Sequence, residues 1–93
     1  MKFKYILSPR AQKDLDRLLD DQGKHIALAA VTKALDLMED DPFHPSLRSK
    51  IYDKKKRVYE SSAQNNTPAA YRIFWHYEPG KKILTILTIV PHP

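Results

Sequence analysis

One arginine stands out in this sequence, because its neighbours are those of a buried strand. Arg72 lies in the run Tyr-Arg-Ile-Phe-Trp-His-Tyr at residues 71–77. Burying an unpaired guanidinium is costly, so this cation needs either a partner or a ligand. Two interpretations follow. Arg72 either holds a buried carboxylate, for which Glu60 is the candidate, or it faces a site that binds anions.

A compact basic cluster precedes that strand. Its members are consecutive in the sequence, and an aromatic residue follows closely: Lys54, Lys55, Lys56, Arg57 and then Tyr59. A cationic run beside an aromatic side chain can hold phosphates and stack a base. The alternative is a loop whose charges are simply solvated.

The charge of the whole chain is equally uneven. Residues 1–47 hold seven Lys and Arg against eight Asp and Glu, whereas residues 48–93 hold nine against three. A basic half of this kind favours a polyanionic partner, nucleic acid first, because clustered cations release counterions from phosphates. A surface that only keeps the protein soluble is the other interpretation.

Length and composition predict a single domain over residues 1–93. The chain has no cysteine, which fits a reducing compartment and excludes thiolate metal sites, so we expect a cytoplasmic protein. No apolar run is long enough to cross a membrane. No pair of histidines has the spacing of metal ligands, and we expect neither a metal nor another cofactor.

The first half of the chain predicts a strand followed by a helical hairpin. Residues 3–7 include two aromatic residues and the β-branched Ile6, and they end at Ser8-Pro9, which suit the N-cap and first turn of a helix. Apolar residues then recur at helical spacing over 9–20 and again over 26–39. Two antiparallel helices are therefore expected.

The second half predicts three strands, over residues 58–62, 71–77 and 82–90. The segment that carries Ile51 and the basic cluster is expected to be a lightly structured connection. The order strand, helix, helix, strand, strand, strand is typical of an α+β fold. The N-terminal strand, the helical hairpin and a three-stranded antiparallel meander would form one sheet with the helices on one face.

Alternation along residues 71–77 divides their side chains between the two faces of that sheet. The more apolar set is expected to pack on the helices: Tyr71, Ile73, Trp75 and Tyr77. Arg72, Phe74 and His76 then point to the open face. This placement favours a site for Arg72 that solvent and ligands can reach.

Three segments of the chain carry a family resemblance. "YILSPRAQKDLDRL" resembles the opening strand and capped helix of the RelE/ParE superfamily of bacterial toxins from toxin–antitoxin pairs. "ALDLMEDDPFHPSLRSKI" resembles its second helix and the break that follows, and "YRIFWHYE" with "ILTILTIV" resembles its paired C-terminal strands. The resemblance covers nearly the whole chain, and the Tyr-Arg-aliphatic motif is its most specific part.

The resemblance implies a function and a set of partners. In the nuclease branch of the superfamily, the arginine matched by Arg72 contributes to a phosphate-binding active site. The chain would then be an endoribonuclease that cleaves mRNA, with the ribosome's help, and a cognate antitoxin protein would silence it. Attack by the ribose 2′-hydroxyl needs a base, an acid and cationic stabilisation. Glu60, His92 and Arg72 are the candidates, in that order.

Several alternatives stay open at this point. In the alternative interpretation, Glu60 neutralises Arg72 structurally and His92 is an ordinary exposed terminal histidine. The basic cluster, expected to contact RNA, could also receive the antitoxin. At the level of function, the chain could be a ParE-like inhibitor of DNA gyrase without nuclease activity, or a member that retains only antitoxin binding.

Overall fold

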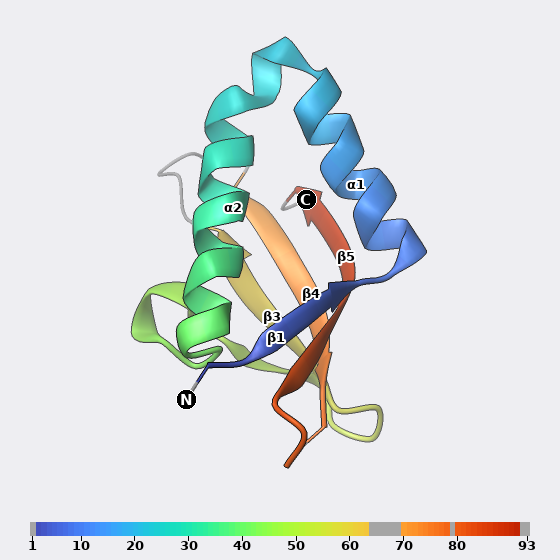
Figure 1. Cartoon of the computed structure of the whole chain (residues 1–93), viewed down its shortest axis with the longest axis vertical. Coiled ribbons are helices and arrows are strands. Elements are labelled where there is room, and N and C mark those ends of the chain that lie inside the picture. The colour runs from blue at the N-terminus through green and yellow to red at the C-terminus, as the bar shows by residue number, and fades with distance from the viewer. Residues whose placement is uncertain (1, 64–69, 79, 92–93) are drawn as a thin grey trace.

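Two helices cover one face of a single sheet (Figure 1). The structure is a computed structural model that describes residues 2–63, 70–78 and 80–91. Within those residues the elements run as follows: β1 (Lys4–Leu7), α1 (Pro9–Asp20), the 3₁₀ turn η1 (Gln22–Lys24), α2 (His25–Asp40), the 3₁₀ turn η2 (Pro45–Leu47), β2 (Lys50–Asp53), β3 (Val58–Ala63), β4 (Tyr71–Tyr77) and β5 (Ile83–Pro91). The predicted α+β architecture is confirmed.

One segment differs from its prediction. Residues 50–53, expected to belong to a lightly structured connection, form β2 and pair antiparallel with β3 at the edge of the sheet. An edge strand of four residues pairs on one side only, and three of these residues are exposed. Its sequence therefore lacks the alternation of apolar and polar residues that indicates a half-buried strand.

The strand order across the sheet is β1-β5-β4-β3-β2. β1 runs parallel to β5, and the other neighbours are antiparallel. The pairing shifts register at two places, because Leu87 in β5 and Tyr52 in β2 have no partner across the ladder. Such bulges bend a strand and redirect its side chains.

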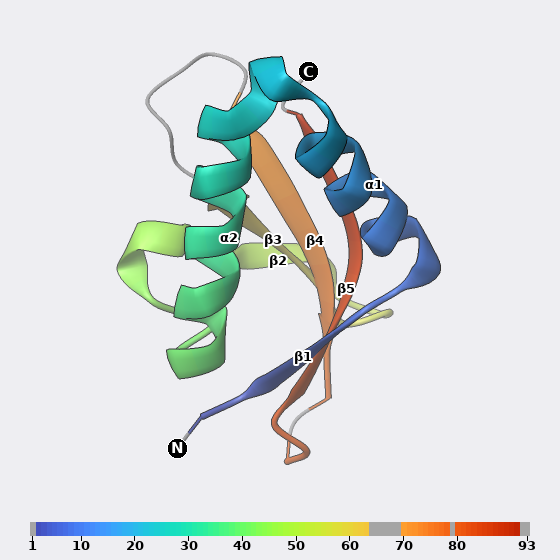
Figure 2. The same cartoon turned by 45° about the horizontal axis from the view of Figure 1, so that its top comes forward.

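The helices lie against one face of the sheet (Figure 2). The buried side chains of the helices and of this face form the hydrophobic core. As predicted, the strand at 71–77 turns Tyr71, Ile73 and Trp75 into this core. The Trp75 indole N–H donates to Ser61 Oγ at 2.8 Å, so its polar atom is satisfied. Among the described residues, no helix has the length and apolar character needed to cross a membrane.

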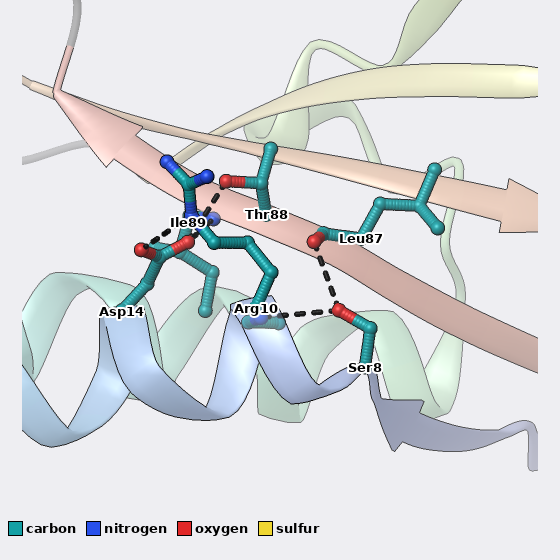
Figure 3. A network of polar contacts seen from close by, with 7 residues as sticks. Ser8, Arg10, Asp14, Leu87, Thr88 and Ile89 are labelled. Atoms are coloured by element: carbon teal, nitrogen blue, oxygen red, sulfur yellow. Dashed lines mark hydrogen bonds and ion pairs between the residues drawn. The ribbon is translucent and has the colours of Figure 1, made fainter.

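Helix α1 holds the part of β5 that extends past the end of β1 (Figure 3). Ser8 caps the helix by accepting the Ala11 N–H at 3.0 Å, and its hydroxyl donates to the Leu87 carbonyl at 2.9 Å. Asp14 Oδ2 accepts the Ile89 N–H at 2.9 Å and the Thr88 hydroxyl at 2.8 Å. These contacts satisfy backbone groups that no neighbouring strand pairs.

Candidate functional site on the open face of the sheet

Arg72 points to the open face of the sheet, as its alternation with buried neighbours predicts. Its side chain is 29% exposed, and its Nη1 donates to Glu60 Oε2 in an ion pair. A guanidinium carries five N–H donors, and this contact engages one of its nitrogens. The two interpretations from the sequence are therefore not exclusive: Arg72 holds a buried carboxylate and also reaches the surface.

Glu60 is the central residue of this arrangement. It leaves β3 on the same face as Arg72, its side chain is only 6% exposed, and its other oxygen, Oε1, lies 3.6 Å from Lys50 Nζ. Lys50 stands directly across from Glu60 in the ladder between β2 and β3. Two cations around one carboxylate leave this cluster with a net positive charge, which suits an anionic ligand.

Lys50 was missed by the sequence interpretation. No local pattern marks it, because its role depends on β2 pairing with β3, and that strand carries little periodicity. Tyr52 was missed for the same reason. It lies on the open face with its ring edge-on to Phe74, the two ring centroids 4.8 Å apart.

The basic cluster forms the turn between β2 and β3, and all four of its side chains are exposed. The turn divides them between two surfaces. Lys56 borders the open-face hollow that contains Tyr52 and Phe74, whereas Lys54 and Arg57 border a second hollow beside Tyr59. The cluster is therefore not one continuous patch.

Tyr59 belongs to the opposite face from Glu60 and Arg72. Its ring stacks on Trp75 with 4.8 Å between centroids and an angle of 18°. Phe43 and Tyr77 complete an aromatic group there. A nucleotide that contacts Tyr59 would therefore approach a different surface from one that contacts Arg72.

His76 shares the open face with Arg72 and ties β4 to the basic turn. Its Nδ1 lies 2.9 Å from the Lys56 carbonyl, and its Nε2 lies 3.9 Å from Glu78 Oε1. The pKa of Glu78 is held below its ordinary value chiefly by the hydrogen bond from Lys81, 3.1 Å away. His92, the proposed acid, lies outside the described residues.

Comparison with known proteins identifies the fold and the family. The sequence profile described as "ParE toxin of type II toxin-antitoxin system, parDE" matches residues 5–92. This chain belongs to the ParE toxin family. It is thus a toxin of a toxin–antitoxin system within the RelE/ParE superfamily, with a cognate antitoxin as its partner. No curated protein sequence matches it closely enough to count as a relative.

Three solved structures share the fold. A YoeB/ParE toxin from Agrobacterium tumefaciens superposes with a TM-score of 0.75 at 9% identity, over 97% of this chain and 99% of that one. The toxin–antitoxin complex RelBE2 from Mycobacterium tuberculosis superposes with a TM-score of 0.66 at 19% identity, over 99% of this chain and 100% of that one. A mutant of the E. coli toxin RelE in the free state superposes with a TM-score of 0.67 at 13% identity, over 97% of this chain and 83% of that one. At these identities the likeness shows the fold alone.

Proposed function

We propose that this toxin inhibits translation by binding mRNA on the open face of its sheet and cleaving it with the help of the ribosome. The observation that carries the proposal is the open-face cluster in which Arg72 and Lys50 flank Glu60. A planar guanidinium can engage two phosphate oxygens, and Lys50 adds a second positive charge nearby.

The proposed chemistry begins with an exchange of partners. In the structure, Arg72 donates to Oε2 of Glu60, and Lys50 Nζ lies 3.6 Å from Oε1. A phosphate that takes Arg72 would free Oε2 to accept a proton. The ribose 2′-hydroxyl could then give its proton to Glu60 while its oxygen attacks the adjacent phosphorus.

The remaining steps require stabilisation of charge and a proton donor. As the new bond from the 2′-oxygen forms, the bond from phosphorus to the 5′-oxygen breaks, which leaves a 2′,3′-cyclic phosphate and a 5′-hydroxyl. Arg72 would stabilise the charge that develops on the phosphate oxygens. The proton for the leaving 5′-oxygen is assigned to His92, which is the sequence-based candidate.

A second function, inhibition of DNA gyrase without nuclease activity, is supported by the same contacts. In the unliganded chain Arg72 is bonded to Oε2 of Glu60, so this oxygen could serve as a base only after Arg72 moves. A toxin that only docks on a protein target needs none. The alternative therefore predicts that the Arg72–Glu60 pair stays intact when the target is bound.

One experiment separates the two functions. The toxin is induced in a bacterium without its antitoxin, and incorporation of labelled amino acids and of labelled thymidine is followed over time. We expect protein synthesis to fall first, with new mRNA ends that carry a 5′-hydroxyl. Failure of DNA synthesis first, together with double-strand breaks, would support the gyrase alternative.

The matched variants are Arg72→Ala and Arg17→Ala. The first removes the open-face guanidinium and should abolish the arrest of protein synthesis. The second removes an exposed arginine from α1, away from the open face, and should leave the arrest unchanged. Arg72→Lys should restore little, because an ammonium lacks the fork that engages two phosphate oxygens.

A further inference from the structure

A groove of about 370 Å³ lies on the open face beside Arg72, Lys50 and Glu60, which we call the Arg72 cluster. We call this hollow the Tyr52 groove. Two bulges from different strands build it. Tyr52 and Leu87 are the residues without a ladder partner in β2 and β5, and both line the groove, with Phe74 of β4 also in its wall. Bulges often redirect side chains near functional sites.

The groove offers an aromatic surface to solvent. Tyr52 is 66% exposed, the largest exposed fraction among the exposed large apolar and aromatic side chains of the described residues. Its ring meets Phe74 at 72°, so Phe74 supports it from one side. Phe74 itself is half-buried. An exposed aromatic ring on the open face of a sheet is a surface on which single-stranded RNA stacks its bases.

We propose that the Tyr52 groove binds one unpaired nucleobase of the RNA, which stacks on Tyr52 while Arg72 engages a phosphate of the same strand. This inference rests on the proposed function and adds a subsite to it. Phe74 and Arg72 are two residues apart on one face of β4, about 7 Å along the strand. One nucleotide can span that separation.

The charges around the groove determine which part of the nucleotide enters. Lys56 lines the groove and can hold a phosphate, whereas the carboxylate of Asp53 repels one. Asp53 Oδ1 accepts the Lys56 N–H at 3.2 Å, which fixes this carboxylate in the turn. The exposed edge of an unpaired base carries N–H groups that could donate to Asp53, whereas a phosphate could not.

The same features favour RNA over an apolar segment of a protein. A protein side chain would use the aromatic pair but would leave Lys56 without an anion. A nucleotide uses the aromatic ring, the cation and the carboxylate together. Phe74, in the wall of the groove, also stands directly across from Glu60 in the ladder between β3 and β4.

The test uses short mRNAs in which one base at a time is replaced by an abasic site. Cleavage on ribosomes programmed with each mRNA gives the toxin concentration for half-maximal rate, and binding of the same RNAs in solution is measured by fluorescence polarisation. For the wild type, loss of one particular base should weaken the interaction by about 5- to 150-fold. The Tyr52→Ala variant should bind intact RNA more weakly by a similar factor. Its affinity should be the same for intact RNA and for RNA that lacks that base.

Two controls isolate the ring. Tyr52→Phe keeps the stacking surface and should stay within about twofold of the wild type. Ile51→Ala changes the neighbouring residue of β2, which is 55% exposed and lines the hollow beside Tyr59 instead, and it should also have little effect.

The possible outcomes are distinguishable. If the wild type responds to no abasic site and Tyr52→Ala matches it, the groove proposal is overturned, while the proposed function stands as long as Arg72→Ala abolishes cleavage. If Tyr52→Ala weakens only antitoxin binding, the groove is a protein-docking surface and the proposal is again overturned. If the wild type neither cleaves nor binds RNA, the proposed function itself fails and this inference with it.

Discussion

Two buried carboxylates, Asp14 and Glu60, are each paired with an arginine, yet their other partners differ. The Asp14 side chain is 5% exposed and the Glu60 side chain 6%. Asp14 accepts the backbone N–H of Ile89 and the hydroxyl of Thr88, and its arginine, Arg10, is mostly exposed (Figure 3). Among the described residues, the Glu60 carboxylate instead has two side chains as its partners, Arg72 and Lys50.

This difference separates a structural support, Asp14, from the candidate site around Glu60. β4 pairs with β5 at Ile89, but on the other side of β5 the described β1 reaches only to Ile86. Asp14 accepts the Ile89 N–H in place of a strand there, and its release would leave a buried donor unpaired. Arg72 and Lys50 both reach the surface, and the proposed function has them turn from Glu60 toward a phosphate. Burial and a nearby arginine therefore do not by themselves identify a functional carboxylate.

Breaking the support should have the largest effect on stability. Asp14→Ala removes two hydrogen bonds to a charged acceptor and strands the Ile89 N–H, so the free energy of unfolding should fall by about 3 kcal/mol. Urea melts followed by Trp75 fluorescence would measure it. Asp14→Asn keeps an acceptor and should lose about half as much.

The matched control is Asp16→Ala on the same helix. Asp16 is exposed and accepts only from Gln12 Nε2 among the described residues. Its loss should change the free energy of unfolding by less than about 0.5 kcal/mol. Equal losses from Asp14→Ala and Asp16→Ala would show that the strand edge does not need the carboxylate.

Breaking the exchangeable pair should have a smaller effect. Removing one partner of a fully buried ion pair costs about 3–5 kcal/mol, but Arg72 is partly exposed and Lys50 remains beside Glu60. We expect Arg72→Ala to cost about 2 kcal/mol and the protein to stay folded. Toxicity should nevertheless be lost.

A double-mutant cycle tests whether this cost belongs to the pair. The double variant with Arg72→Ala and Glu60→Ala should lose less free energy of unfolding than the two single variants lose together, by about 1 kcal/mol. Strict additivity would mean that the two side chains stabilise the fold independently. The contrast between Asp14 and Glu60 would then fail, because Glu60 would not depend on its pairing with Arg72.

The sequence predicted the elements of the fold well where the chain is periodic or carries a cap. Ser8 and Pro9 marked the start of α1, and the alternation of β4 correctly placed Arg72 on the open face. β2 was missed, because a short edge strand is stabilised by pairing that its own sequence does not reveal. Pairing partners distant in sequence are the part that local patterns leave undetermined.

The same limit applies to the candidate site. Arg72 and Glu60 could be named from their types, but their meeting depends on the register between β3 and β4. Lys50 and Tyr52 depend on β2 and on its bulge, so no sequence signal pointed to them. The roles of Glu60, Arg72 and the basic cluster in RNA cleavage and binding stay predictions.

An exposed ion pair provides the smallest effect and sharpens the comparison between Asp14 and Glu60. Glu78 lies in the turn after β4, and Lys81, 3.1 Å away, lowers the pKa of Glu78 from its ordinary value of 4.5 through a hydrogen bond and its charge. A lowered pKa in the folded state means that any stabilisation is present above pH 4.5 and is lost as the pH falls through the folded value. Lys81→Gln should therefore raise the pKa of Glu78 back toward 4.5, as an NMR titration of its side-chain carboxyl carbon would show.

Glu78→Gln should leave the thermal midpoint at neutral pH unchanged, because water and salt screen an exposed pair. A loss as large as that from Asp14→Ala would instead mean that the stability of these pairs does not follow burial and backbone contact, and the distinction between support and site would lose its physical basis.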